Sequence, residues 1–240
     1  MKLAILTDIH GNVQALDAVL NELDGQGIDD IWSLGDMIAM GPDSNEVMAR
    51  LLDRGVKMIT GNHDEAVLSL LAGTGHPESY AHTRTHHEWV ARTLRPDYAD
   101  ALMKLPRTIE QTIGREHIYG IHYHIPTEKR EASIVDEPFH DIVEATLPNM
   151  QRLFGDYAAD VVCFGHHHPV HAFQDECKRY FNPGALGVAK DDLARYGVLQ
   201  WDEAGLRVLA KTILYDKPSF MNKMERDEVP QREVMWRLFY

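Results

Sequence analysis

Cysteine and long apolar runs are both scarce in this chain. Only Cys163 and Cys177 occur among 240 residues, too few for a disulfide framework and typical of reduced thiols. The opening run Leu3-Ala4-Ile5-Leu6 is too short for the apolar region of a secretory signal peptide. No stretch is long enough to span a bilayer as a helix. We therefore expect a cytoplasmic protein without a membrane partner.

Positive charge is also in short supply. The sequence has 24 Lys and Arg against 37 Asp and Glu, which gives a formal net charge of −13. A broad nucleic-acid surface needs clustered Lys and Arg, so this balance argues against one. A metal-centred phosphate site escapes that objection, because bound cations reverse the local charge. Composition thus argues against a broad nucleic-acid surface and leaves a metal site open.

The first 60 residues alternate short apolar runs with amphipathic stretches. Residues 2–7, 30–34 and 56–60 have the apolar character of buried strands. Between them, Asn12 and Pro42 open stretches whose apolar residues recur at helical spacing. This order predicts a parallel sheet with right-handed crossovers.

The rest of the chain adds a helical segment and further strands. Residues 64–105 have a helical pattern with Gly and Pro breaks, and we expect the part at about 73–105 to be an insert that acts as a cap. A helix is expected near 140–154, and strands are expected at 107–124 (two), 160–164, 170–174, 178–182, 196–202 and 206–212. The predicted fold class is α/β, or α+β in four layers, with two packed mixed β-sheets flanked by helices.

Asp, Asn and His side chains recur at turns that directly follow expected strands. The turns are Asp8-Ile9-His10, Gly35-Asp36, Gly61-Asn62-His63-Asp64 and Gly165-His166-His167-His168. These side chains supply the N and O donors that divalent metals bind. Turns that converge on one edge of a sheet would bring the donors together. The pattern therefore indicates a two-metal hydrolytic centre.

The spacing within the turns suits shared ligation. In Asp8-Ile9-His10 the two outer side chains point the same way while Ile9 turns into the core. His166 and His168 have the same spacing, so both can point into one site.

The other two turns would supply complementary ligands. The carboxylate of Asp36 can bridge two ions, because its oxygens offer separate lone pairs. Asn62 adds a neutral amide oxygen, which limits anionic charge where an anionic substrate must approach.

Each motif alone also has an ordinary explanation. Asp-x-His pairs and Gly-Asp turns are common, and residues 61–64 could simply cap a helix. Three consecutive imidazoles after the apolar run at 161–164 have no packing rationale. Because every motif follows its own strand, their joint order favours metal binding.

Together these motifs resemble the calcineurin-like metallophosphoesterase superfamily. That family shows, in order, Asp-x-His, Gly-Asp, Gly-Asn-His-Asp/Glu, a later strand-borne His, and Gly-His-x-His, and the counterparts here run through most of residues 1–212. The stretches 35–42 and 182–184 are similar to the smaller bacterial and archaeal branch, which includes YfcE-like phosphodiesterases and some diadenosine polyphosphate hydrolases. The resemblance implies the metallophosphoesterase sandwich and a phosphoric ester hydrolase.

The resemblance further implies two divalent metal ions as cofactors. Mixed O/N ligation suits manganese, iron, nickel, cobalt or zinc. One ion would be held by Asp8, His10, Asp36 and His168, and the other by Asp36, Asn62, His122 and His166.

The mid-chain ligand is the least regular match. The family usually shows His-Gly after a strand, whereas this chain has Ile121-His122-Tyr123-His124. His122 follows the strand at the expected place and is our choice, with His124 as the alternative. Tyr123 replaces the customary small residue, which changes the local loop.

The implied activity is hydrolysis of a small phosphomonoester or phosphodiester, including a nucleotide. A hydroxide that bridges the two ions would attack phosphorus in line with the leaving oxygen. The resemblance makes His63 the general acid or transition-state stabiliser, with Asp64 orienting its imidazole. The alternatives are a phosphoprotein phosphatase and a non-catalytic metal-binding scaffold. Scaffolds in this superfamily typically lose His63 or some ligands, so their retention here favours an enzyme.

Substrate choice should depend on residues outside the metal ligands. We predict that Asn45, Tyr123 and His124 contact substrate, together with the insert. Tyr80 or Trp89 of the insert could stack on a base, although Trp89 equally suits the apolar face of an ordinary helix.

The C-terminal residues differ in character from the domain predicted at 1–215. Residues 216–240 are charged yet rich in Phe, Met, Trp and Leu, and we expect a helix after Pro230. An apolar end of this kind is rarely left in solvent. The tail should pack on its own domain or across a homodimer.

Overall fold

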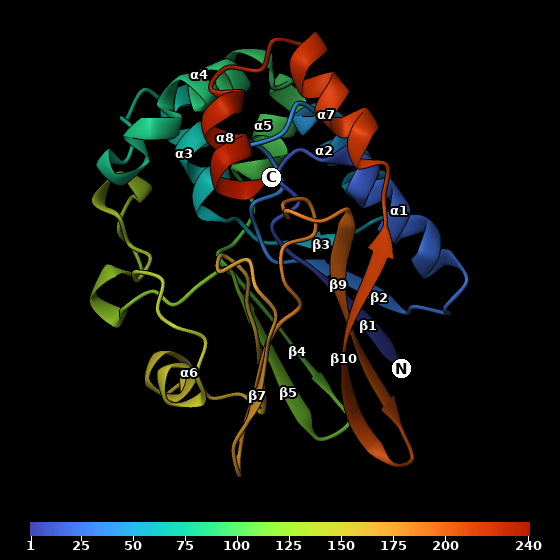
Figure 1. Ribbon diagram of the computed structural model, residues 1–240. Helices are drawn as coiled ribbons and strands as arrows, with labels where there is room; N and C mark the ends of the chain where they lie inside the picture. Colours follow the sequence, from blue (N-terminus) through green and yellow to red (C-terminus); the bar gives the residue numbers. More distant parts are fainter.

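Two mixed five-stranded β-sheets form the centre of the structure (Figure 1), a computed structural model that describes residues 1–240. The first sheet has the order β10-β9-β1-β2-β3, and the second has the order β4-β5-β6-β8-β7. In the first sheet β1, β2 and β3 are parallel, while β9 and β10 run antiparallel to their neighbours. In the second sheet β5, β6 and β8 are parallel, with β4 and β7 as antiparallel edges. The strands are β1 (Lys2–Leu6), β2 (Asp30–Ser33), β3 (Lys57–Met58), β4 (Thr108–Ile113), β5 (Glu116–Ile121), β6 (Val161–Cys163), β7 (His171–Gln174), β8 (Arg179–Asn182), β9 (Leu193–Asp202) and β10 (Gly205–Leu214).

Helices cover the outer faces of both sheets, which completes the four layers. In Figure 1 most of them gather at one end of the sheets, opposite the β4–β5 and β9–β10 hairpin turns. The helices are α1 (Val13–Asp24), α2 (Ser44–Asp53), α3 (Asn62–Leu71), α4 (Arg84–Thr93), α5 (Pro96–Leu102), α6 (Leu147–Phe154), α7 (Lys217–Arg226) and α8 (Arg232–Phe239). Short 3-10 turns lie at Glu78–Thr83, Thr127–Lys129 and Ile134–Asp136. The predicted fold class is confirmed.

Apolar clusters hold the layers together. Between the sheets, Ile5 and Trp32 of the first sheet pack with Phe181 of the second in one buried cluster. A larger cluster joins the first sheet to the helices, and a third joins the second sheet to α6 through Phe154. Burying apolar area of this kind is the main favourable term in folding. Because these clusters fix both sheets, the strand ends that carry the site are held rigidly.

Two predicted elements differ in extent from those observed. The helix expected near 140–154 begins only at Leu147, because the Thr146 side chain caps it by accepting a hydrogen bond from the amide of Asn149. The C-terminal segment forms α7 before Pro230 as well as α8 after it. None of the helices combines the length and apolar character that a membrane span requires.

The C-terminal helices pack against the body of the same chain. Phe220, Met224 and Met235 are fully buried in the large cluster between the first sheet and its helices. In Figure 1 the chain end, marked C, lies at the end of α8 in the upper half of the view, above the sheets. This packing brings α8 to the edge where the predicted ligands lie.

Candidate metal centre

The predicted ligands come from strand ends that meet at one edge of the two sheets. Asp8 and His10 follow β1, Asp36 follows β2, and Asn62 begins α3 after β3. From the second sheet, His122 follows β5 and both His166 and His168 follow β6. All seven residues lie together, in the arrangement that the sequence motifs predicted.

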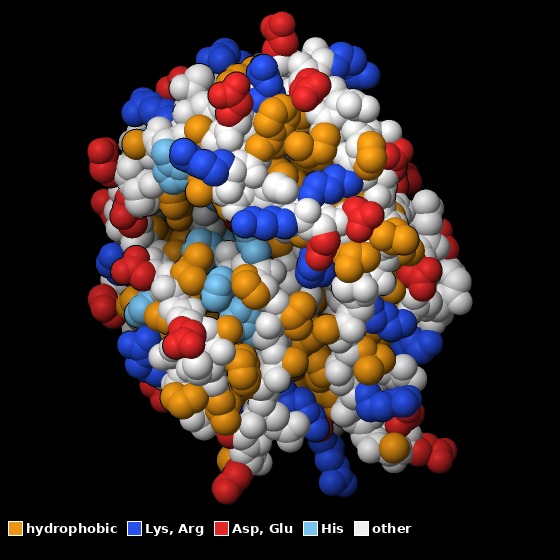
Figure 2. Space-filling view, viewed as in Figure 1, with side chains coloured by type: hydrophobic (Ala, Val, Ile, Leu, Met, Phe, Trp, Pro, Cys, Tyr) orange, Lys and Arg blue, Asp and Glu red, His pale blue; other side chains and the backbone are white.

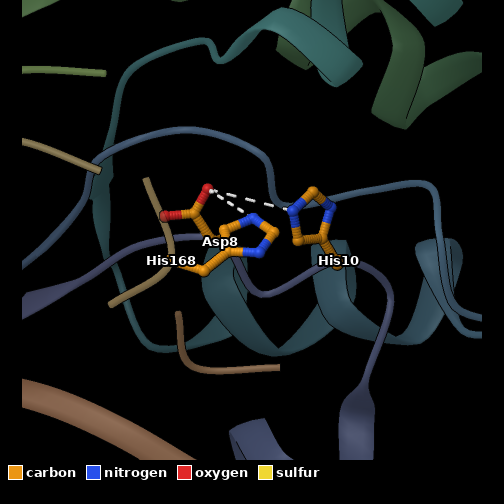
Figure 3. Close-up of side chains that lie close together, drawn as sticks. All are labelled: Asp8, His10 and His168. Atoms are coloured by element: carbon orange, nitrogen blue, oxygen red, sulfur yellow. Dashed lines mark ion pairs between the residues drawn. The ribbon is translucent and has the colours of Figure 1, made fainter. Parts of the chain in front are cut away.

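The first group consists of Asp8, His10 and His168, and Figure 3 shows both imidazoles turned toward one oxygen of Asp8. The Nε2 atoms of His10 and His168 each lie 3.8 Å from Asp8 Oδ1. The candidate donor atoms of the group are all within 4.8 Å of one another. That spacing leaves room for one ion among them.

The second group consists of Asp36, His122 and His166. Asp36 Oδ2 lies 3.3 Å from His122 Nε2 and 3.7 Å from His10 Nε2, so this oxygen stands between the two groups. Asn62 Oδ1 lies 2.8 Å from His122 Nε2 and 2.7 Å from His166 Nδ1. Asp36 is therefore placed to bridge, and Asn62 completes the second group.

The geometry also distinguishes between the two mid-chain histidines. His122 is buried at the site, and its Nδ1 lies 2.7 Å from the carbonyl oxygen of Leu34. That hydrogen bond orients the ring so that Nε2 points at Asp36 and Asn62. His124 is outside the site, with its Nδ1 3.2 Å from the Tyr157 hydroxyl.

Left-handed backbone positions the donors. Asp8, His10, Asp36 and His166 have φ between 51° and 65°, which is uncommon outside glycine. Such strain persists only where the surrounding structure enforces it, and it is concentrated at functional sites. Backbone hydrogen bonds from His10 to Asp36 and from Asp8 to Gly35 tie the first two turns together.

The polar atoms of the site fit a pair of divalent cations. Both ring nitrogens of His10 are buried without a hydrogen-bond partner, and so is the amide nitrogen of Asn62. Burial lowers the pKa of His10 to about 4, which keeps its imidazole in the neutral form that binds metals. Burial disfavours a charged His122, but the Asp36 and Asp8 carboxylates outweigh it and raise the pKa of His122 to about 9. Buried carboxylates thus demand positive charge here, which cations would supply.

His63 stands beside the metal groups at the start of α3. Its amide donates a 2.8 Å hydrogen bond to Asp36 Oδ1, and its ring lies 5.2 Å from that of His10. Tyr80 stacks on its other side, with ring centroids 5.3 Å apart at 20°. His63 lines the cavity described below, so its ring can reach a bound molecule.

Asp64 is placed differently from the role that the resemblance implies. Its carboxylate accepts hydrogen bonds from the backbone amides of Met37, Ile38 and Gly61, at 3.0 to 3.1 Å. It makes no hydrogen bond to the His63 ring, whose Nδ1 lies 2.9 Å from His87 Nε2 instead. Asp64 therefore anchors the loop after Asp36, and the ring contact of His63 is made with His87.

A cavity of about 510 Å³ opens onto the metal groups. Figure 2 shows the histidines gathered in a hollow with hydrophobic side chains around it. Phe139 stacks on His166, and Phe239 of α8 stacks on His10, with interplanar angles of 20° and 23°. The lining residues are Asp36, Asn62, His63, Ser79, Tyr80, His82, Glu137, Phe139, His140, Asp141, Ile142, His166, His167, His168, Pro169, Leu238 and Phe239.

The predicted substrate contacts Asn45, Tyr123 and His124 do not line this cavity. The Asn45 side chain donates a hydrogen bond to the carbonyl oxygen of Thr93 and accepts one from the amide of Arg95, between α4 and α5. Tyr123 is fully buried beneath the site, because it points away from His122 into the cluster around α6. These three assignments are corrected accordingly.

The aromatic residues of the insert divide between the cavity and the core. Tyr80 lines the cavity, so stacking on a base stays a prediction for it, while Trp89 packs against the large apolar cluster. Phe139 and Phe239 were missed. Phe139 lies in an irregular segment whose apolar residues show no helical or strand periodicity. For Phe239, the apolar character of the C-terminal residues indicated that the chain end would pack against the protein.

Comparison with solved structures identifies the fold. The crystal structure of a metallophosphoesterase from Sphaerobacter thermophilus matches with a TM-score of 0.71 at 21% identity, covering 98% of this chain and 97% of that chain. At this identity the likeness shows the fold, which is the metallophosphoesterase sandwich.

The sequence comparison then identifies the family. The model of the calcineurin-like phosphoesterase superfamily domain matches residues 1–204, and the chain therefore belongs to this superfamily. The uncharacterized protein MJ0912 of Methanocaldococcus jannaschii is 25% identical over 254 residues, covering 95% of this chain and 94% of that protein. The symmetrical bis(5'-nucleosyl)-tetraphosphatase of Erwinia tasmaniensis is 37% identical over 78 residues, but this match spans only 31% of the chain and 28% of that enzyme.

Proposed function

We propose that this protein is a metal-dependent hydrolase of a small phosphomonoester or phosphodiester, with a dinuclear centre. The observation that carries the proposal is the meeting of two metal-binding groups at Asp36, beside a buried His10 whose ring nitrogens have no partner. Membership of the phosphoesterase superfamily supports the reaction class. When bound, two divalent cations supply a nucleophilic hydroxide at neutral pH and neutralise the phosphoryl oxygens.

The donor sets assign residues to each ion. Asp8, His10 and His168 would hold one ion, and Asn62, His122 and His166 the other, with Asp36 shared between them. The mixed N/O donors suit manganese, iron, nickel, cobalt or zinc. Because Asn62 is neutral, the second group carries less negative charge where the substrate phosphate must approach.

His63 would donate the hydrogen bond to the leaving group. Its Nδ1 is engaged by His87, so Nε2 is the nitrogen available to the cavity. Burial lowers the pKa of His63 to about 3 before any substrate is bound. A neutral ring with its proton on Nε2 can donate a hydrogen bond to an alkoxide-like leaving oxygen and stabilise the negative charge that develops there, which matters most for a poor leaving group.

The cavity favours a substrate with one phosphoryl group and an aromatic or apolar part. Its walls include Tyr80, Phe139 and Phe239, which suit a flat ring such as a nucleobase. Apart from histidines, the charged side chains that line it are acidic: Asp36, Glu137 and Asp141. A polyphosphate would place additional negative charge against Glu137 and Asp141. A mononucleotide or cyclic nucleotide therefore fits better than a diadenosine polyphosphate.

A hydrolysis panel on metal-reconstituted protein tests the proposal. It compares p-nitrophenyl phosphate, bis-p-nitrophenyl phosphate, cyclic nucleotides, diadenosine polyphosphates and a phosphopeptide, with bound metal measured in parallel. We expect turnover of the simple esters and of a nucleotide. If both ions bind and no ester is hydrolysed, the protein is a scaffold, and turnover of the phosphopeptide alone would make it a phosphoprotein phosphatase.

A further inference from the structure

Three histidines form a continuous chain that leads away from the metal centre. His63 Nδ1 lies 2.9 Å from His87 Nε2, and His87 Nδ1 lies 2.8 Å from His76 Nε2. The ring centroids are 5.1 Å apart at both steps. His87 and His76 belong to neither metal group, so the metal ligands do not explain this arrangement.

Burying the His87 imidazole costs free energy unless its ring nitrogens make hydrogen bonds. His87 is fully buried on α4, and both of its ring nitrogens are used by the other two histidines. His76 is half-buried in the loop that follows α3, and it is the histidine of the three that lies farthest from the metal groups. A buried imidazole without such hydrogen bonds would lose the free energy of solvating its polar nitrogens. The contacts therefore fix the His87 ring in one orientation.

The chemistry of imidazole links this orientation to His63. A neutral ring has one N–H donor and one acceptor nitrogen, so each contact needs a donor facing an acceptor. If His87 Nε2–H donates to His63 Nδ1, the proton of His63 must be on Nε2, toward the cavity. The same pattern continues outward when His76 Nε2–H donates to His87 Nδ1. With the hydrogen bonds in this direction, the three histidines fix both the orientation and the tautomer of the His63 ring.

No carboxylate performs this task, because Asp64 uses its oxygens on backbone amides. We propose that His87, supported by His76, is the positioning residue that holds the His63 imidazole with its Nε2–H toward the leaving oxygen. This inference rests on the proposed function, since only an acid that donates to substrate requires positioning. The helical insert thereby contributes to catalysis without touching substrate.

Two substrates that differ only in the leaving group test the inference. The probes are p-nitrophenyl phosphate and phenyl phosphate, or their methyl phosphodiesters if the diester is preferred. In His87→Leu we expect kcat on the phenyl ester to fall about 100-fold, because the poor leaving group needs the acid. On the p-nitrophenyl ester it should fall less than about 10-fold, since p-nitrophenolate leaves without protonation. KM and metal content should be unchanged.

Further variants separate positioning from folding. His87→Gln keeps a hydrogen-bonding atom near Nε2 and should recover most of the loss. In a His63→Ala background, His87→Leu should have no further effect, because the two residues act as one unit. His86→Leu is the matched control, since His86 is also buried on α4 but its ring nitrogens have no partner. It should leave both rates within about twofold, because the His86 ring makes no hydrogen bond to His63, His87 or His76.

The outcomes are distinct. If the wild-type protein is active and kcat of His87→Leu falls equally on both esters, the inference is overturned and the proposed function stands. Loss of metal from His87→Leu would have the same meaning. A metal-loaded wild-type protein that hydrolyses neither ester overturns both. If His87→Leu does not fold, His76→Leu tests the same chain from its outer end. It should show a smaller loss with the same leaving-group dependence, and equal losses on both esters would again contradict the inference.

Discussion

At the scale of single residues, His63 is the side chain whose role differs most from that of its neighbours. Its ring lines the cavity, stacks on Tyr80 and is hydrogen-bonded to His87, while the adjacent Asn62 is one of the proposed metal ligands. The proposed ligand and the proposed catalytic group are therefore separable by substitution, although they are adjacent in sequence.

His63→Ala should lower kcat on an ester with a poor leaving group by about 10²–10⁴-fold, the usual range for a general acid. Bound metal should stay near the wild-type level, because the ring is outside both donor groups. Steady-state kinetics together with elemental analysis of the purified protein measures both quantities. A parallel loss of metal and activity would mean that His63 supports the metal centre instead.

Gly165 is a residue whose absent side chain matters. A Cβ at this position would lie 1.9 Å from Thr7 Oγ1 and 2.8 Å from Asp8 Oδ2. Gly165→Ala should therefore displace Asp8, weaken metal binding and destabilise the protein by about 1–3 kcal/mol, as overpacking does. Metal titration and thermal unfolding measure these effects. Gly25→Ala is the control, since a Cβ there meets nothing within 4 Å, and an equal effect of both variants would contradict the account.

At the scale of elements, α8 connects the chain end to the site. Phe239 stacks on His10 and lies 5.4 Å from the ring of His168, while Met235 anchors the same helix in the core. The helix therefore forms one wall of the cavity. Whether the tail also mediates a homodimer remains a prediction.

Phe239→Ala should raise KM for aromatic esters several-fold, because removing a ring contact costs about 0.5–1.5 kcal/mol. Metal content should be unchanged, since Phe239 supplies no donor atom. KM values for an aryl and an alkyl phosphate distinguish lost stacking from general damage. Arg237→Ala, an exposed neighbour on α8, serves as the control. An equal rise in KM on both esters would show that the ring does not contact substrate.

Elements and their ends were largely predictable from sequence. The ligand motifs directly follow strands, so local apolar patterning was enough to place Asp8, Asp36 and His166 at one edge. Tyr123 was misassigned because the turn after β5 decides which neighbour of His122 points inward. The contact between His63 and His87 joins residues 24 apart through the packing of α3 on α4, for which no local pattern exists.

At the scale of the whole molecule, the site joins the two sheets. Asp8, His10 and Asp36 come from the first sheet, and His122 and His168 from the second, so a pair of cations would bind across their junction. On the proposed function, this acidic chain would bind an anionic substrate where those cations compensate its charge. Metal binding is thus the property on which the whole account depends.

The most direct test is a titration of the metal-free protein with Mn²⁺, in which bound metal and hydrolysis of bis-p-nitrophenyl phosphate are followed together. We predict that two ions bind per chain and that hydrolysis rises with the second ion. In Asp36→Asn, which removes the carboxylate between the groups, both the second equivalent and the activity should be lost. Full activity with one ion bound, or two bound ions with no hydrolysis in the substrate panel, would contradict a dinuclear phosphoesterase.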